Sequence, residues 1–259
     1  MKQGITEGNH RSFVIPVHDR TRVDAGIFHH FHLSWINAIS NALNDGRLPD
    51  GYYALAEQTA GKKVPDVIAL HRPAAEPDDG YAGDTGTSVV VAKPRVRITS
   101  VCDADRYAKK KNTIVIRHSS GDRIVALLEI VSQGNKSSKD AFRRFVQKLV
   151  NRIDSGYHVM VVDLQVPTIR DPNGIHGAIR DELDEELYTA PPDKPLTLAS
   201  YCSDVDKTAY VEPIAVGDPL IEMPLFPNPD HYVNVPLVET YQTAWQHLPE
   251  RWRAVIEPH

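Results

Sequence analysis

The sequence predicts an α/β fold in which helices flank a mixed β-sheet. Residues 124–128 are continuously apolar, and continuous hydrophobicity is typical of a central strand that is covered on both faces. An amphipathic stretch follows, and then a second apolar run at residues 158–164. A strand, a helix of this length and a second strand form a right-handed crossover, so these two strands are expected to be parallel. Hairpin signals elsewhere add antiparallel strands.

The first element is expected to be a helix over residues 25–44. Its apolar residues recur at intervals of three and four, so the helix should bury one stripe. Asp24 stands where it can cap the free amide groups, and Gly46 stands where it can end the helix.

Alternating side chains predict a strand at residues 51–58, and a second strand is expected at 64–70. The following stretch, 73–94, is rich in Pro, Asp, Gly and Thr, which indicates a mobile surface loop. Such a loop is either a lid or a tolerated surface insertion, and we favour the insertion. Strand character returns at residues 95–101.

Residues 113–117 and 123–131 are expected to form a hairpin, because the five residues between them have turn chemistry. Ser137 or Ser138 can cap the crossover helix, which runs to about residue 155. Gly156 is placed to stop it.

The C-terminal part is expected to add smaller elements to this core. An acidic stretch at 180–186 predicts an exposed helical turn, and residues 196–200 and 209–215 predict a further hairpin. Prolines recur through the extension 217–259, where they break long elements. Residues 237–247 are expected to form a short helix on the surface. We interpret residues 1–259 as a single domain.

Composition limits the classes of protein that the chain can represent. Its 41% hydrophobic and 24% charged residues are ordinary for a globular protein, and no apolar run is long enough for a membrane helix. The first residues lack the layout of a signal peptide, so a cytoplasmic protein is expected without a membrane partner. Cys102 and Cys202 form neither a disulfide framework nor a zinc motif. The net charge of −5 argues against coating nucleic acid through bulk electrostatics, and nothing indicates an oligomer.

Three acidic residues and a lysine form the sharpest chemical pattern. Asp66 lies on one expected strand, Glu129 ends a buried strand, and Lys136 follows a few residues later. Converging carboxylates bind Mg²⁺ or Mn²⁺, because hard cations prefer oxygen ligands. Glu57 ends the preceding strand and is a candidate third oxygen ligand. Such an ion activates water and neutralises a phosphate, while a lysine stabilises the transition state.

Each of these residues also has a plain structural interpretation, as an acid that meets solvent at a strand end or as a solvated lysine. The pair of acids is more informative, because a buried carboxylate needs a partner or an ion. His29 and His32 share one helix face and are a conceivable metal pair, but no further ligand accompanies them. The basic run at 109–111 is expected to be a solvated turn.

Several segments resemble a bacterial family of uncharacterised proteins, the domain-of-unknown-function family 4058. The family is similar to the Uma-type putative endonucleases, so the resemblance implies the restriction-endonuclease-like fold of the PD-(D/E)XK kind. The matching residues are 23–29, 51–58, Pro65-Asp66-Val67, 129–132 with Asn135-Lys136, 155–158, 162–164 and 218–220.

The resemblance implies that Asp66 is the motif aspartate and that Glu129 is the second acid. The pattern places a lysine two residues after the second acid, where this chain has Val131. Related families move the lysine to the adjacent loop or helix, so Lys136 is the first substitute, with Lys139 and Lys148 behind it. The implied activity is metal-dependent cleavage of DNA, and the alternative is a binding or assembly module that has lost catalysis.

Overall fold

The structure is a computed structural model that describes residues 16–60, 110–183, 188–204 and 207–257. By its internal contacts the chain divides into two units, one made of residues 1–58 with 112–259 and the other of residues 59–111. The strands expected at 64–70 and 95–101 and the loop expected at 73–94 lie outside the described residues, and Asp66 and Cys102 lie outside them too.

A six-stranded mixed sheet forms the centre of the first unit, with its strands in the order β1 to β6. The β2–β3, β4–β5 and β5–β6 pairs are antiparallel, whereas β3 and β4 are parallel. The predicted α/β class and the predicted parallel pairing of the two apolar strands are therefore confirmed. The strands are β1 (Tyr52–Ala60), β2 (Lys110–His118), β3 (Arg123–Ile130), β4 (His158–Asp163), β5 (Leu196–Ser203) and β6 (Lys207–Ile214).

The crossover between β3 and β4 contains the short helix α2 (Gln133–Lys136) and the long helix α3 (Lys139–Asp154). Ser138 caps α3 by accepting a hydrogen bond from the backbone amide of Ala141 at 3.1 Å. Gly156 follows the helix with φ of 81°, a left-handed conformation that a glycine adopts at little cost. These features confirm the expected helix, while α2 was not predicted.

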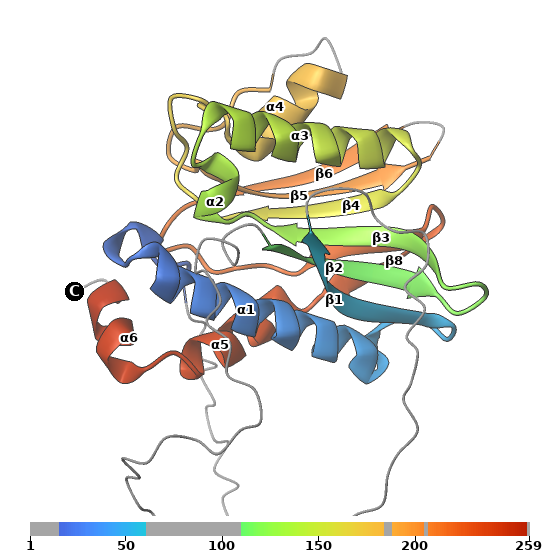
Figure 1. Ribbon diagram of the computed structural model, residues 1–259, viewed down its shortest axis with the longest axis horizontal. Coiled ribbons are helices and arrows are strands. Elements are labelled where there is room, and N and C mark those ends of the chain that lie inside the picture. Colours follow the sequence, from blue (N-terminus) through green and yellow to red (C-terminus); the bar gives the residue numbers. More distant parts are fainter. Residues whose placement is uncertain (1–15, 61–109, 184–187, 205–206, 258–259) are drawn as a thin grey trace, which may run out of the picture. The chain divides into compact units, whose positions relative to one another are not determined.

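Helices cover both faces of the sheet (Figure 1). Helix α3 and helix α4 (Gly174–Leu183) pack on one face, against alternate residues such as Leu127 and Val159. The opposite face, which carries Leu128 and Met160, is covered by α1 (Ala25–Ala42), by α5 (Leu237–Gln246) and by the hairpin of β7 (Met223–Asn228) and β8 (His231–Val235). Burial on both faces explains the uninterrupted apolar runs of β3 and β4.

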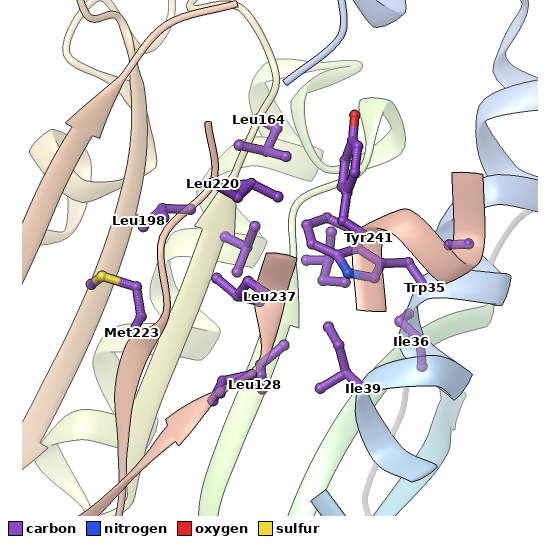
Figure 2. Packing of buried hydrophobic residues seen from close by; sticks show 14 of the residues in the cluster. Trp35, Ile36, Ile39, Leu128, Leu164, Leu198, Leu220, Met223, Leu237 and Tyr241 are labelled. Atoms are coloured by element: carbon purple, nitrogen blue, oxygen red, sulfur yellow. The ribbon is translucent and has the colours of Figure 1, made fainter. Parts of the chain in front are cut away.

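The larger core lies between the sheet, α1 and α5. Figure 2 shows Trp35 and Ile39 of α1 near Leu237 and Tyr241 of α5, with Leu128 of β3 close by. The rings of Trp35 and Tyr241 meet edge to face with centroids 5.1 Å apart.

Helix α1 begins and ends close to the predicted positions, with one difference at its start. Asp24 occupies the N-cap position, but its side chain makes no capping hydrogen bond; instead its carbonyl oxygen accepts from the amides of Ile27 and Phe28. A short π-helical turn, η2 (Leu43–Arg47), ends the helix, and Gly46 has φ of 85° there. The 3-10 turn η1 (Arg20–Arg22) precedes α1 in the chain.

The C-terminal third is more ordered and more buried than the sequence indicated. Residues 180–183 of the turn expected at 180–186 are the end of α4, which begins six residues earlier and buries Ile175 and Ile179, and residues 184–186 lie outside the described residues. The hairpin of β5 and β6 belongs to the main sheet. The proline-rich extension forms β7 (Met223–Asn228), β8 (His231–Val235), α5 and α6 (Glu250–Ile256). Helix α5 is a core helix and not a surface helix, because Leu237, Tyr241 and Trp245 are buried.

Candidate functional site

Glu129 is a buried carboxylate on the sheet face that α3 covers. Only 3% of the residue is exposed. Its Oε1 atom accepts a hydrogen bond from the Thr113 hydroxyl at 2.8 Å and forms an ion pair with the Lys148 amine. The Lys148 amine also donates to the Thr113 oxygen at 3.3 Å. Side chains from β2 and α3 therefore meet at one carboxylate oxygen of β3.

The local sequence explains how these three side chains meet. Ile114 of β2 pairs with Leu128 of β3, so the next residues along, Thr113 and Glu129, lie side by side on the opposite face. Helix α3 crosses that face and carries Lys148 above it. About a quarter of the Lys148 side chain is exposed, which is usual for a lysine that buries its stem and keeps its amine near water.

The second carboxylate oxygen of Glu129, Oε2, is in a different situation. Among the described residues no hydrogen bond or ion pair reaches it. A carboxylate oxygen that no donor among the described residues reaches is able to bind a cation. A metal site at this position would need a further carboxylate besides Glu129.

Lys136 belongs to another buried cluster. Its amine forms ion pairs with Asp163 at 2.8 Å and with Asp171 at 2.6 Å, and donates to the carbonyl of Gln165 at 3.2 Å. Only 5% of the Lys136 side chain is exposed. The amine is thus surrounded by oxygens at the end of β4, and the structure does not bring it to Glu129 with an ion pair.

Asp163 is a buried acid that the sequence reasoning did not select as a site residue. Burial raises the pKa of its carboxyl, and the neighbouring Lys136 ammonium acts in the opposite direction. Its oxygens also accept from the amides of Gln165 and Ile175. The signal was present in the sequence, because Asp163 follows an apolar strand just as Glu129 does.

Glu57 is paired with an arginine. Its Oε1 accepts a hydrogen bond from Nε of Arg117 on β2 at 3.0 Å and forms an ion pair with Nη2 of the same residue at 2.9 Å. The partly exposed pair joins neighbouring strands of the sheet. The structure therefore gives Glu57 a cationic partner of its own.

The remaining candidates are dispersed. Lys139 is exposed at the start of α3, and Lys109 lies outside the described residues. His29 is exposed, whereas His32 is buried and its Nε2 donates to the carbonyl of Ile130 at 2.9 Å. Burial lowers the pKa of His32 to about 4. Within the described ranges, no three His, Cys, Asp or Glu side chains are grouped as a metal site.

Comparison with protein-family models, with curated proteins and with solved structures finds no match for the chain. Among the helices that the structure describes, none has the length and apolar character needed to cross a bilayer.

Proposed function

We propose that the chain has a restriction-endonuclease-like fold related to family 4058, and that it hydrolyses DNA phosphodiesters with Mg²⁺ or Mn²⁺ at a site built from Asp66, Glu129 and Lys148. The observation that carries the proposal is the pairing of a buried strand carboxylate with a lysine amine from the following helix. A mixed sheet with helices on both faces is compatible with this fold.

Lys148 takes the place of the lysine that the sequence pattern lacks at Val131. Lys136 was the first substitute, but two carboxylates already hold its amine. Lys148 is the one lysine among the three substitutes that, within the described residues, contacts Glu129. An ammonium group at this position stabilises negative charge that develops on a phosphate.

The fit of a divalent cation depends on two carboxylates. Glu129 would offer Oε2, and Asp66 would supply the second oxygen from the segment outside the described residues. When bound, the cation supplies an activated water and neutralises phosphate charge. The hydrogen bond from the Thr113 hydroxyl orients Glu129. The Lys148 amine lies beside the same carboxylate, where it would contact the phosphate.

A non-catalytic binding or assembly module is the second candidate, and a specific observation favours it. Oε1 of Glu129 already has an ammonium partner, and Glu57 has a guanidinium partner. Buried ion pairs of this kind satisfy carboxylates without a metal. In such a module the acids that once served catalysis hold the sheet and α3 together.

A plasmid-cleavage assay tests the two candidates. Supercoiled DNA is incubated with Mg²⁺ or Mn²⁺ and with wild type, Glu129→Gln, Lys148→Met or the control Arg144→Met, an exposed position on α3. The nuclease proposal predicts cleavage by wild type and the control, and a loss of roughly 100-fold or more in the other two. If folded wild type cleaves no DNA with either metal, the nuclease proposal is wrong and the binding or assembly module is the remaining candidate.

A further inference from the structure

A groove of about 440 Å³ lies between α3, α4 and the loop that follows β4. This volume is in the range of small-molecule sites. The groove is separate from the Glu129 site, because Lys148 comes nine residues after Lys139 and so lies on the opposite side of α3 from it.

Three cationic side chains line the groove: Lys139, Arg143 and Arg170. Lys139 and Arg143 are one turn apart on the first half of α3. Arg170 donates to the carbonyl of Lys136 at 3.2 Å, which places it near the start of the same helix. Within the described residues, no carboxylate forms an ion pair with any of the three. The amino end of α3 adds its own partial positive charge.

The loop wall of the groove is held in shape by the buried cluster around Lys136. Asp171 binds the Lys136 amine with Oδ2, and its Oδ1 accepts from the amide of Thr168 at 2.9 Å. The turn between Thr168 and Asp171 presents Ile169, which is 97% exposed. A fixed turn that displays an isoleucine to solvent offers an apolar contact at the rim.

The rest of the groove combines apolar and acidic groups. Phe142, Val146 and Ala178 give it an apolar lining, and Asp181 and Glu182 stand in the last turn of α4. Cations therefore come from α3 and the loop, whereas carboxylates come from α4. A ligand that contacts all of these side chains needs an anionic group for the cations, a flat or apolar body for the apolar lining, and hydrogen-bond donors for the carboxylates.

We propose that this groove binds a phosphomonoester of the nucleoside monophosphate class. The phosphate pairs with Lys139, Arg143 and Arg170, which together can give charge-assisted hydrogen bonds. The base packs against Phe142 and Ile169, and Asp181 and Glu182 accept hydrogen bonds from ribose hydroxyl or exocyclic amino groups. The inference does not rest on the nuclease proposal.

Calorimetric titration of the full chain tests this assignment. The ligands are the four common nucleoside monophosphates, adenosine and inorganic phosphate, and the proteins are wild type, Arg143→Ala and the matched control Arg144→Ala. We expect saturable binding of at least one monophosphate, more than tenfold tighter than adenosine or phosphate. Arg143→Ala should weaken it at least tenfold, and the neighbouring Arg144→Ala should leave it unchanged.

Three results would overturn the assignment. The first is no saturable binding of any monophosphate to folded wild type. The second is equal affinity for monophosphate and inorganic phosphate, which would mark a simple anion patch. The third is equal weakening by Arg143→Ala and Arg144→Ala, which would mark non-specific attraction to the charged surface of α3. Circular dichroism of each variant shows whether it remains folded, and Phe142→Leu, which changes the apolar lining of the groove, replaces Arg143→Ala if that variant is unfolded.

Discussion

At the scale of single residues, two clusters of side chains compensate the buried charges. Glu129 shares one oxygen between a hydroxyl and an ammonium group, while Lys136 is enclosed by two carboxylates and a carbonyl. Removing the partner of a buried charge leaves that charge uncompensated, and this costs more free energy than the intact ion pair contributes.

Replacement of Lys136 tests this reasoning. Lys136→Met leaves Asp163 and Asp171 without their common cation, and we expect the free energy of unfolding to fall by about 3–5 kcal/mol in urea denaturation. Adding Asp163→Asn should restore part of the loss, because one of the two buried carboxylates is then neutral. Lys139→Met, at an exposed position, should change stability by less than about 0.5 kcal/mol. An unchanged urea midpoint for Lys136→Met would refute the cluster.

Buried histidines make stability depend on pH, and three of them have a strongly lowered pKa. Burial lowers the pKa of His18, His32 and His176 to about 4, from a usual value of 6.5. Between those values the unfolded chain binds protons that the folded chain does not, so stability is complete above about pH 6.5 and falls as the pH drops toward 4.

His32→Gln should reduce this dependence. The glutamine amide can still donate to the carbonyl of Ile130 but cannot take up a proton. Urea denaturation at pH 7 and pH 5 should show wild type losing about 2 kcal/mol more than the variant. Equal losses would mean that His32 is not kept neutral by the fold.

At the scale of secondary-structure elements, α3 links the candidate site to the groove. One side of the helix carries Lys148 to Glu129, and its first turns carry Lys139 and Arg143 to the groove. The cap that fixes its first turn is Ser138. Both proposals therefore depend on where α3 lies on the sheet and on how it is rotated about its own axis.

Ser138→Ala removes the cap and should cost about 1 kcal/mol of stability, the usual effect of losing an N-cap hydroxyl. Thermal unfolding followed by circular dichroism measures the change. Ser137→Ala is the control, because the Ser137 hydroxyl donates to a carbonyl outside α3. A larger effect at Ser137 than at Ser138 would contradict the observed cap.

Local patterns predicted the elements whose burial is visible in the chain itself. The apolar runs of β3 and β4 and the stripe of α3 led to the parallel crossover. The β7–β8 hairpin was missed because Pro224 and Pro227 lie within β7. Prolines fit there since the sheet has only two strands and its register shifts between Leu225 and Asn228.

The candidate site was predictable only in part, for a physical reason. An acid after five apolar residues indicated that Glu129 is buried and needs a partner. The identity of that partner depends on how α3 is rotated against β3. We ranked Lys136 before Lys148 because Lys136 is nearer to Glu129 in the chain. Asp171, which holds Lys136, lies far from it in sequence and carried no comparable signal.

At the scale of the whole first unit, the C-terminal segment completes the core. Leu225 of β7 and Leu237, Tyr241 and Trp245 of α5 are buried against α1 and the sheet. Their removal would expose the apolar face that carries Leu128 to water, at a cost of roughly 2 kcal/mol for each large side chain.

A chain that ends at residue 217 should therefore fail to fold. We expect it to be insoluble, or to lack a cooperative thermal transition, because many buried side chains are lost together. A chain that ends at residue 248, which keeps α5 and lacks α6, is the matched comparison and should retain a transition at lower temperature. A cooperative transition in the shorter chain would show that the extension is dispensable.

The most direct test of the proposed function is calorimetric titration of Mn²⁺ into wild type, Glu129→Gln, Asp66→Asn and the exposed control Glu250→Gln. The nuclease proposal predicts saturable binding to wild type and to the control, with more than tenfold weaker binding to each of the other two. Absence of saturable binding to folded wild type, or binding that Glu129→Gln does not weaken, would contradict it and leave Glu129 and Lys148 as a structural ion pair.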